Sequence, residues 1–142
     1  MTIAKMTVPE LEKFLRAEFP QAFSGDDILI EAADGCSCRL RQRYSERMLR
    51  PGGTISGPTL MALADFAMYV VLLSAIGPVG LAVTTNLNIN FLRKGAPGRD
   101  VLAEARILKL GKRLAVGEVS LLSASSANPI AHVTATYSIP VA

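Results

Sequence analysis

The stretch Gly52–Gly77, GGTISGPTLMALADFAMYVVLLSAIG, is strongly apolar and contains a single charged side chain, Asp65. Pro58 suits the first turn of a helix, where its missing N–H would have no intrahelical partner, and the pattern predicts a helix from about Pro58 to Ser74. Burying an isolated ionised carboxylate costs free energy unless the group is paired or takes part in chemistry. Asp65 is therefore the first candidate for a functional residue. A structural carboxylate, held by backbone groups or by an interface arginine, is the alternative.

The composition is that of an ordinary globular protein. The 142 residues are 50% hydrophobic and 19% charged, which excludes a disordered chain and predicts one domain over residues 1–142, with residues 1–20 as a helical extension. The formal net charge of +3 is compatible with a small anionic ligand but is too slight to indicate a nucleic-acid partner.

The segment Leu60–Ile76 is nearly long enough to span a bilayer. Asp65 within the segment and the prolines that flank it favour a buried core helix instead. The N-terminal residues lack the apolar core of a signal peptide. We therefore expect a soluble, cytoplasmic protein with no membrane partner.

Cys36 and Cys38 are the only cysteines. A disulfide between residues i and i+2 of one strand would be badly strained. A metal site would need further ligands, and the only histidine, His132, lies far along the chain. We expect two reduced structural thiols and no metal site. We also expect no catalytic role for His132, because a lone histidine in a strand is more often structural.

The rest of the sequence predicts one further helix and six strands. Thr7 and Glu10 form a capping box that opens a helix ending before Pro20. A pair of strands and a long loop lead into the apolar helix, and four strands follow it. The predicted strands cover residues 27–35, 36–43, 81–94, 100–110, 113–124 and 130–140, with a turn near Asp34-Gly35 and a two-residue hairpin at Gly111-Lys112.

The order of the elements predicts how they pack. A helix that is apolar all round must be wrapped on most sides, and a strongly curved antiparallel sheet can do so. The predicted fold is therefore an α+β hot-dog arrangement, with one side of the helix bare unless a second subunit covers it. In the first strand after the helix, alternation places Leu87, Ile89 and Phe91 on one face and Thr84, Asn86, Asn88 and Asn90 on the other.

Four segments resemble the PaaI-like acyl-CoA thioesterases of the hot-dog fold: GGTISGPTLMALADFA, TTNLNINFLRKGAPG, EARILKLGKRLAVGEV and PIAHVTATYSIP. In that family a Gly-x-x-His-Gly-Gly segment opens the helix, and a carboxylate lies nine residues after the His. Gly53 and Gly57 match glycines of that segment, Ser56 stands at the His position, Pro58 replaces the last Gly, and Asp65 falls on the carboxylate.

The resemblance implies hydrolysis of an acyl-CoA to a carboxylic acid and free coenzyme A, with water as co-substrate and no cofactor. Asp65 would activate a water for attack on the thioester carbonyl, or would attack that carbon itself. The Gly57 N–H, at a helix N-terminus, would stabilise the carbonyl oxygen as it becomes negative. Thr84 would help to hold the water, and Ser56 would lie on the substrate side.

Coenzyme A carries phosphates, which need cations at the mouth of the site. Arg93 and Lys94, just past the strand on the ligand side, are the preferred candidates for this role. The acyl group itself is not predicted, because the apolar helix offers residues that admit either an aromatic or a medium aliphatic chain: Met61, Phe66, Met68 and Tyr69.

Gly57 and Asp65 are eight positions apart, which separates them by about 12 Å along one helix. A base or nucleophile works within about 3 Å of its target, so one helix cannot supply both groups to one thioester. Two antiparallel helices related by a two-fold axis can, so we expect an obligate homodimer with two shared sites, whether or not dimers pair into a tetramer.

Two alternative functions remain. One is an acyl-CoA-binding hot-dog protein without turnover, which the Ser-Gly-Pro replacement favours. The other is a purely structural or regulatory dimer.

Overall fold

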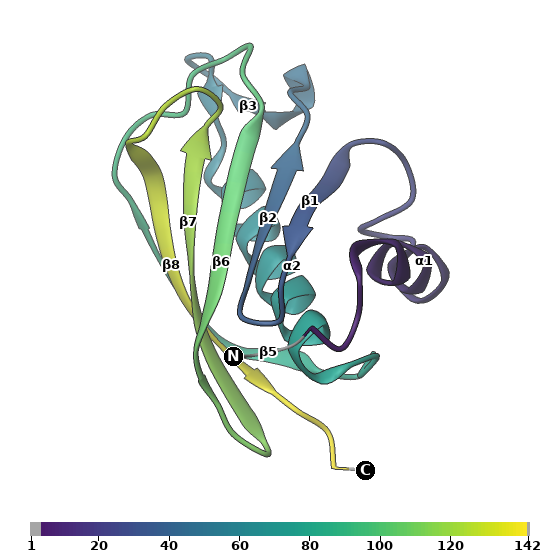
Figure 1. Cartoon of the computed structure of the whole chain (residues 1–142). Coiled ribbons are helices and arrows are strands. Elements are labelled where there is room, and N and C mark those ends of the chain that lie inside the picture. The colour runs from purple at the N-terminus through teal and green to yellow at the C-terminus, as the bar shows by residue number, and fades with distance from the viewer. Residues whose placement is uncertain (1–3, 142) are drawn as a thin grey trace.

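The computed structural model in Figure 1 describes residues 4–141. The elements follow the predicted order, with a 3-10 turn and a short two-stranded hairpin added in the loop before the long helix. Their bounds are α1 Val8–Glu18, β1 Ile28–Ala33, β2 Ser37–Gln42, η1 Glu46–Met48, β3 Leu49–Arg50, β4 Thr54–Ile55, α2 Gly57–Ile76, β5 Val83–Phe91, β6 Val101–Leu110, β7 Leu114–Ser123 and β8 Pro129–Ser138.

Six of the strands form one antiparallel sheet in the order β1-β2-β6-β7-β8-β5. Helix α2 contacts all six of them, which requires the sheet to curve around the helix (Figure 1). The inward residues of β6, β7 and β8 are small or branched, such as Ala103, Val119 and Val133, and all three are fully buried. The predicted α+β hot-dog fold is confirmed.

Helix α1 begins where the sequence predicts. The Thr7 N–H donates to Glu10 Oε1 at 2.9 Å and the Glu10 N–H donates to Thr7 Oγ1 at 3.3 Å, which is the predicted capping box. The helix buries Leu11 and Leu15 and lies beside β1 (Figure 1). The predicted extension starts at residue 1, so its first three residues lie outside the described part of the chain.

Helix α2 has a smaller bare side than the sequence suggests. Of its 20 residues, 13 are buried within the single chain. The chain after α1 closes much of the expected gap, because Phe19 and Phe23 pack against Phe66 with ring centroids 6.1 and 5.9 Å away. What stays exposed is a narrow strip near the start of the helix, formed by Pro58, Met61 and Ala62. The helix is long and apolar enough to cross a membrane, but this burial is that of a core helix.

A β-bulge in β5 changes the face on which Thr84 lies. Thr84 pairs with Tyr137 and Asn86 pairs with Thr136, so Thr85 is an extra residue in the strand. Tyr137 is buried on the inner face, and Thr84 opposite it turns toward α2 rather than lying with Asn86. The prediction that placed Thr84 on the asparagine face was wrong, because strict alternation takes no account of an inserted residue.

The β6–β7 turn is longer than predicted. Strand β6 ends at Leu110 and β7 begins at Leu114, so three residues, not Gly111-Lys112 alone, connect them. The Gly111 N–H donates to the Leu114 carbonyl at 2.8 Å and closes the turn.

Both cysteines are free thiols. Cys36 is exposed, whereas Cys38 is buried and its Sγ donates to the Ala67 carbonyl at 3.4 Å. Burial raises the pKa of the Cys38 thiol to about 12, which keeps it protonated and unreactive.

Candidate active site

Asp65 lies in the middle of α2 and is half-buried. Its side chain is on the wall of a cavity of about 400 Å³ between the helix, the start of β5 and the end of β8. Among the described residues, no Lys, Arg or His side chain forms an ion pair with it. The cavity is lined by Glu18, Phe19, Asp65, Tyr69, Gly80, Ala82, Val83, Thr84 and Tyr137.

Two hydroxyl groups hold the Asp65 carboxylate. Thr84 Oγ1 donates to Asp65 Oδ1 at 2.5 Å, which brings together two of the residues predicted for the site. The Tyr137 hydroxyl lies 2.9 Å from the same Oδ1 and 3.0 Å from the backbone carbonyl oxygen of Asp65. The carboxylate therefore has neutral hydrogen-bond donors rather than a cation as its partners.

Tyr137 was missed by the sequence analysis. Alternation in the last strand does place Tyr137 on the same face as Val133 and Ala135, and so toward the helix. Its position opposite Thr84 depends on the bulge, which the sequence did not reveal. Burial and the nearby Asp65 carboxylate raise the pKa of the Tyr137 hydroxyl, so this group is a proton donor under all ordinary conditions.

Gly57 lies in a different cavity, at the N-terminus of α2. This cavity has a volume of about 480 Å³ and is lined by Arg50, Thr54, Ile55, Gly57, Leu60, Phe91, Leu92, Arg93, Lys94 and Gly95. The Gly57 N–H has no hydrogen-bond partner within residues 4–141. It is one of the first helical N–H groups, which lack intrahelical acceptors and favour negative charge.

The Phe91 ring covers Gly57. A Cβ added at Gly57 would lie 3.1 Å from the ring, closer than an ordinary van der Waals contact. Glycine therefore lets the aromatic ring lie directly over the start of the helix. Phe91 itself remains 54% exposed.

Ser56 has a structural task at this end of the helix. Its Oγ accepts a hydrogen bond from the Thr59 N–H at 3.3 Å and lies 2.8 Å from Thr59 Oγ1. This is an N-cap, which fixes the point where α2 begins and so orients the Gly57 N–H.

The two predicted cations line the cavity of Gly57. Arg93 is exposed and its guanidinium donates to the Pro129 carbonyl at 2.7 Å, while Lys94 is exposed beside it. The structure adds Arg50, from the short strand β3, to the same cavity. Arg50 was not predicted for the site, because it lies in the loop before the helix, where no periodicity indicates the direction of a side chain.

The two parts of the predicted site do not meet within one chain. Asp65 and Thr84 line one cavity, whereas Gly57, Arg93 and Lys94 line another. The helix itself keeps them apart, since Gly57 and Asp65 are separated by about two turns.

Of the four helix residues considered for the acyl group, only Tyr69 lines the cavity of Asp65. Met68 is fully buried against Gly117 in the core, and Phe66 is buried against Phe23. Met61 is 41% exposed on the strip at the start of α2.

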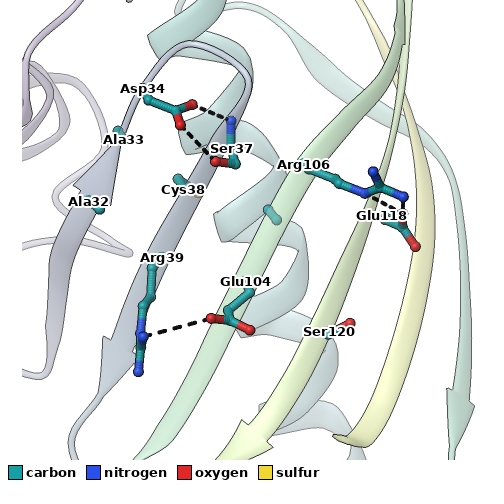
Figure 2. Close-up of a pocket in the computed structure, with 11 residues that line it drawn as sticks. Ala32, Ala33, Asp34, Ser37, Cys38, Arg39, Glu104, Arg106, Glu118 and Ser120 are labelled. Carbon is teal, nitrogen blue, oxygen red and sulfur yellow. Dashed lines mark hydrogen bonds and ion pairs between the residues drawn. The ribbon is translucent and has the colours of Figure 1, made fainter.

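A third cavity, of about 490 Å³, lies over β1, β2, β6 and β7 (Figure 2). Four of its charged side chains are paired: Arg106 contacts Glu118 at 2.6 Å and Arg39 lies 3.8 Å from Glu104. The fifth, Asp34, accepts hydrogen bonds from Ser37 and from the Cys36 N–H. His132 Nε2 lies 2.8 Å from Glu118 Oε1, and the hydrogen bonds from His132 and Arg106 lower the pKa of Glu118. His132 therefore belongs to a surface network and lies away from Asp65, in agreement with its predicted structural role.

Comparison with known proteins identifies the family. A sequence model of the thioesterase superfamily matches residues 52–129, which is more than half of the chain, so the chain belongs to this superfamily. A presumed thioesterase from Silicibacter sp. TM1040 has a crystal structure with 43% identity and a TM-score of 0.88, over 97% of this chain and 94% of that one. A presumed esterase of Saccharolobus solfataricus is 30% identical over 122 residues, 85% of this chain and 78% of that protein.

Two more distant structures share the fold. The PaaI protein of Escherichia coli is 22% identical with a TM-score of 0.72, over 92% of this chain and 90% of that chain. A hypothetical thioesterase protein of Streptococcus pneumoniae, solved with coenzyme A, is 18% identical with a TM-score of 0.76, over 92% and 96%. The predicted resemblance to PaaI-like hot-dog proteins is confirmed, and membership of the superfamily supports thioester hydrolysis as the chemistry.

Proposed function

We propose that the protein hydrolyses the thioester of an acyl-CoA, with Asp65 as the reacting carboxylate. The observation that carries this proposal is the state of Asp65: it is half-buried on a cavity wall, held by hydroxyl groups and, among the described residues, unpaired with any cation. A purely structural carboxylate in a core helix would be expected to have a cation or backbone N–H groups as partners.

The reaction follows from this arrangement. Asp65 removes a proton from a water molecule as the water oxygen bonds to the thioester carbon. The carbon–sulfur bond then breaks, the thiolate of coenzyme A takes up the proton, and the acid is released. Direct attack by Asp65 would instead form a mixed anhydride, which water would hydrolyse to the same products. The Thr84 hydroxyl donates its only proton to Asp65, so the lone pairs of Thr84 Oγ1 can accept a hydrogen bond from the water.

The Gly57 N–H is the proposed donor to the carbonyl oxygen. It is without a partner in the described chain and lies at the positive end of α2. A donor directed at a developing oxyanion is worth about 10²–10³-fold in kcat. Pro58 removes the next possible N–H, so this proposal depends on Gly57 alone at this helix end.

Coenzyme A is the proposed carrier because of the charge around Gly57. Arg50, Arg93 and Lys94 line this cavity without a lining carboxylate, which suits phosphate groups. The structural neighbour from S. pneumoniae that was solved with coenzyme A supports a ligand of this kind.

A homodimer would unite the two parts of the site. Strand β5 ends the sheet and pairs only with β8, so its other edge is open within the described residues, and edges of this kind pair with a second chain. Phe91, at one end of β5, lies over Gly57, and Thr84, near the other end, contacts Asp65. A two-fold axis beside β5 would therefore bring the Gly57 end of one chain to the Asp65 end of its partner. The exposed strip with Met61 would be covered in the same contact.

The second candidate is an acyl-CoA-binding protein without turnover. It is favoured because Ser56 stands where the family has His and Pro58 stands where the family has Gly. The deciding experiment is release of free thiol from acetyl-, hexanoyl-, palmitoyl- and phenylacetyl-CoA, with each binding constant measured in parallel. Asp65-dependent turnover of any of them supports the enzyme. Micromolar binding of all four without turnover would contradict it. A cytoplasmic location remains a prediction.

A further inference from the structure

We infer that Tyr137 is a positioning residue for Asp65, and that Asp65 reacts through Oδ2. The inference rests on the proposed function, because it assigns tasks within that same site. Tyr137 had no predicted role, and the two oxygens of the Asp65 carboxylate are here assigned different tasks.

The two carboxylate oxygens have different surroundings. Oδ1 accepts hydrogen bonds from both Thr84 and Tyr137, at 2.5 and 2.9 Å. Oδ2 has no hydrogen-bond partner among the described residues. No buried side-chain oxygen in the described chain lacks a partner, so Oδ2 is accessible from the cavity. Oδ2 is therefore the oxygen that can reach a water or a thioester carbon.

Tyr137 differs from Thr84 because it makes two contacts with Asp65. Its hydroxyl lies 3.0 Å from the Asp65 carbonyl oxygen as well as 2.9 Å from Oδ1, so one proton is shared between backbone and side chain of the same residue. This geometry restricts rotation of the carboxylate and keeps Oδ2 directed at the cavity. A reacting group held in one orientation avoids the loss of rate that follows from small displacements.

The fold fixes Tyr137 in this place. It lies opposite Thr84 in the β5–β8 ladder, so the bulge that turns Thr84 inward also sets the two hydroxyls side by side. The Tyr137 ring stacks on Tyr69, with centroids 6.1 Å apart and planes 21° apart. The Tyr69 hydroxyl donates elsewhere, to the Gly80 carbonyl at 3.0 Å. Two stacked tyrosines thus line one cavity, and only the hydroxyl of Tyr137 forms a hydrogen bond with Asp65.

Tyr69 therefore provides a matched control. Tyr137→Phe and Tyr69→Phe each remove one phenolic hydroxyl from the same stacked pair and keep both rings. Only Tyr137→Phe removes a hydrogen bond to the Asp65 carboxylate, because the Tyr69 hydroxyl donates to the Gly80 carbonyl. We expect Tyr69→Phe, which changes the wall of the cavity, to act on KM and to lower kcat severalfold less than Tyr137→Phe does.

The split between kcat and KM is the readout. Loss of orientation acts on the chemical step, so Tyr137→Phe should lower kcat by about tenfold while KM for the best acyl-CoA changes by less than about twofold. Thr84→Val should lower kcat further in combination with Tyr137→Phe, and Thr84→Ser, which keeps a hydroxyl, should restore the activity lost in Thr84→Val. Circular dichroism and thermal unfolding confirm that each variant folds.

The outcomes separate the inference from the function. If the wild-type protein shows no Asp65-dependent hydrolysis, the proposed function fails and the inference fails with it. If hydrolysis depends on Asp65 but Tyr137→Phe keeps the wild-type kcat, the inference alone is overturned. An equal loss of kcat in Tyr69→Phe would also overturn it, because the effect would then come from the cavity as a whole.

Discussion

The start and the middle of α2 differ in the kind of chemical group that each presents to its cavity. At Gly57 the proposed functional group is a backbone N–H in an open cavity, which the exposed cations Arg50, Arg93 and Lys94 also line. At Asp65 it is a side chain, held by hydroxyls from two neighbouring strands. The first region is suited to receive an anionic ligand, and the second to hold one reactive atom still.

The comparison supports the proposal that two chains share the site. Each region lacks what the other has: there is no carboxylate lining the cavity of Gly57, and no Lys or Arg lining the cavity of Asp65. The helix that joins the two regions also holds them about 12 Å apart. Two antiparallel copies would place each region against its complement, and the following predictions test that relation.

The largest effect is expected from Asp65→Asn. The amide oxygen can accept the hydrogen bonds from Thr84 and Tyr137, so the side chain keeps its place, but the group at the cavity can no longer take a proton or attack. We expect kcat to fall by roughly 10²-fold or more, with acyl-CoA binding retained. Steady-state kinetics and calorimetric titration measure the two quantities. Wild-type turnover in this variant would end the catalytic assignment.

Complementation between two inactive chains is expected to give the next largest effect. Gly57→Pro removes the donor N–H, and a proline at this first helical position fits the extended backbone of Ser56. The Gly57→Pro chains are mixed with Asp65→Asn chains and the dimers are reassembled. If the chains pair at random, half of the dimers are hybrids, and each hybrid has one intact site out of two. Activity should return to about a quarter of wild type. Absence of recovery, with hybrids verified by mass spectrometry, would contradict the shared site.

The structure supplies the control for that experiment. Any side chain at Gly57 meets the Phe91 ring, so a loss of activity in Gly57→Pro could come from the moved ring alone. Gly57→Ala places a Cβ in the same position and keeps the N–H. We expect Gly57→Ala to retain at least tenfold more activity than Gly57→Pro, given the usual value of an oxyanion donor. Equal losses in both variants would assign the effect to Phe91.

The sequence predicted the start of each helix well, because short-range chemistry determines it. The Thr7–Glu10 capping box and Pro58 both act within one turn, and α1 and α2 begin within a residue of the predicted positions. The order of the elements along the chain followed from the hydrophobic pattern. Asp65 stood out because a charge in an apolar helix is rare enough to notice.

The surroundings of Asp65 were harder to predict, because they depend on register between distant segments. Thr84 was assigned to the wrong face because one inserted residue in β5 reverses alternation. Tyr137 lies 72 positions from Asp65 in sequence, and only the paired strands bring them together. The covering of α2 by Phe19 and Phe23 likewise depends on how the chain turns after α1, where no pattern is present.

A smaller effect, on substrate affinity, is expected at the open end of the helix. Lys94→Ala should raise KM for an acyl-CoA by about threefold to tenfold with little change in kcat, because it removes one exposed charge near the proposed phosphate site. The difference should shrink as salt is added. Lys94 is a better test than Arg93, whose guanidinium also holds the Pro129 carbonyl at the start of β8. Lys109, exposed on β6 and outside both cavities, is the matched control. An equal rise in KM for Lys109→Ala would indicate a general charge effect.

The smallest effect on turnover is expected from Ser56→Ala, and it separates stability from chemistry at the start of α2. The variant loses the N-cap that accepts the Thr59 N–H, so the free energy of unfolding should fall by about 1 kcal/mol, measured by urea denaturation at one fixed protein concentration.

Ser56→Asp is the informative partner of that variant. Aspartate is as good an N-cap as serine, and its charge favours the helix N-terminus, so stability should be kept or slightly raised. The same negative charge weakens the positive potential at the Gly57 N–H, which would otherwise stabilise a developing oxyanion. It also repels the phosphates proposed to bind near Arg50 and Lys94. We therefore expect the order of the two variants to reverse: Ser56→Ala is the less stable but the more active, and Ser56→Asp is the more stable but the slower by severalfold. If Ser56→Asp matched the turnover of Ser56→Ala, the helix start would have no electrostatic part in the reaction, and the role proposed for Gly57 would have to be abandoned while that of Asp65 stood.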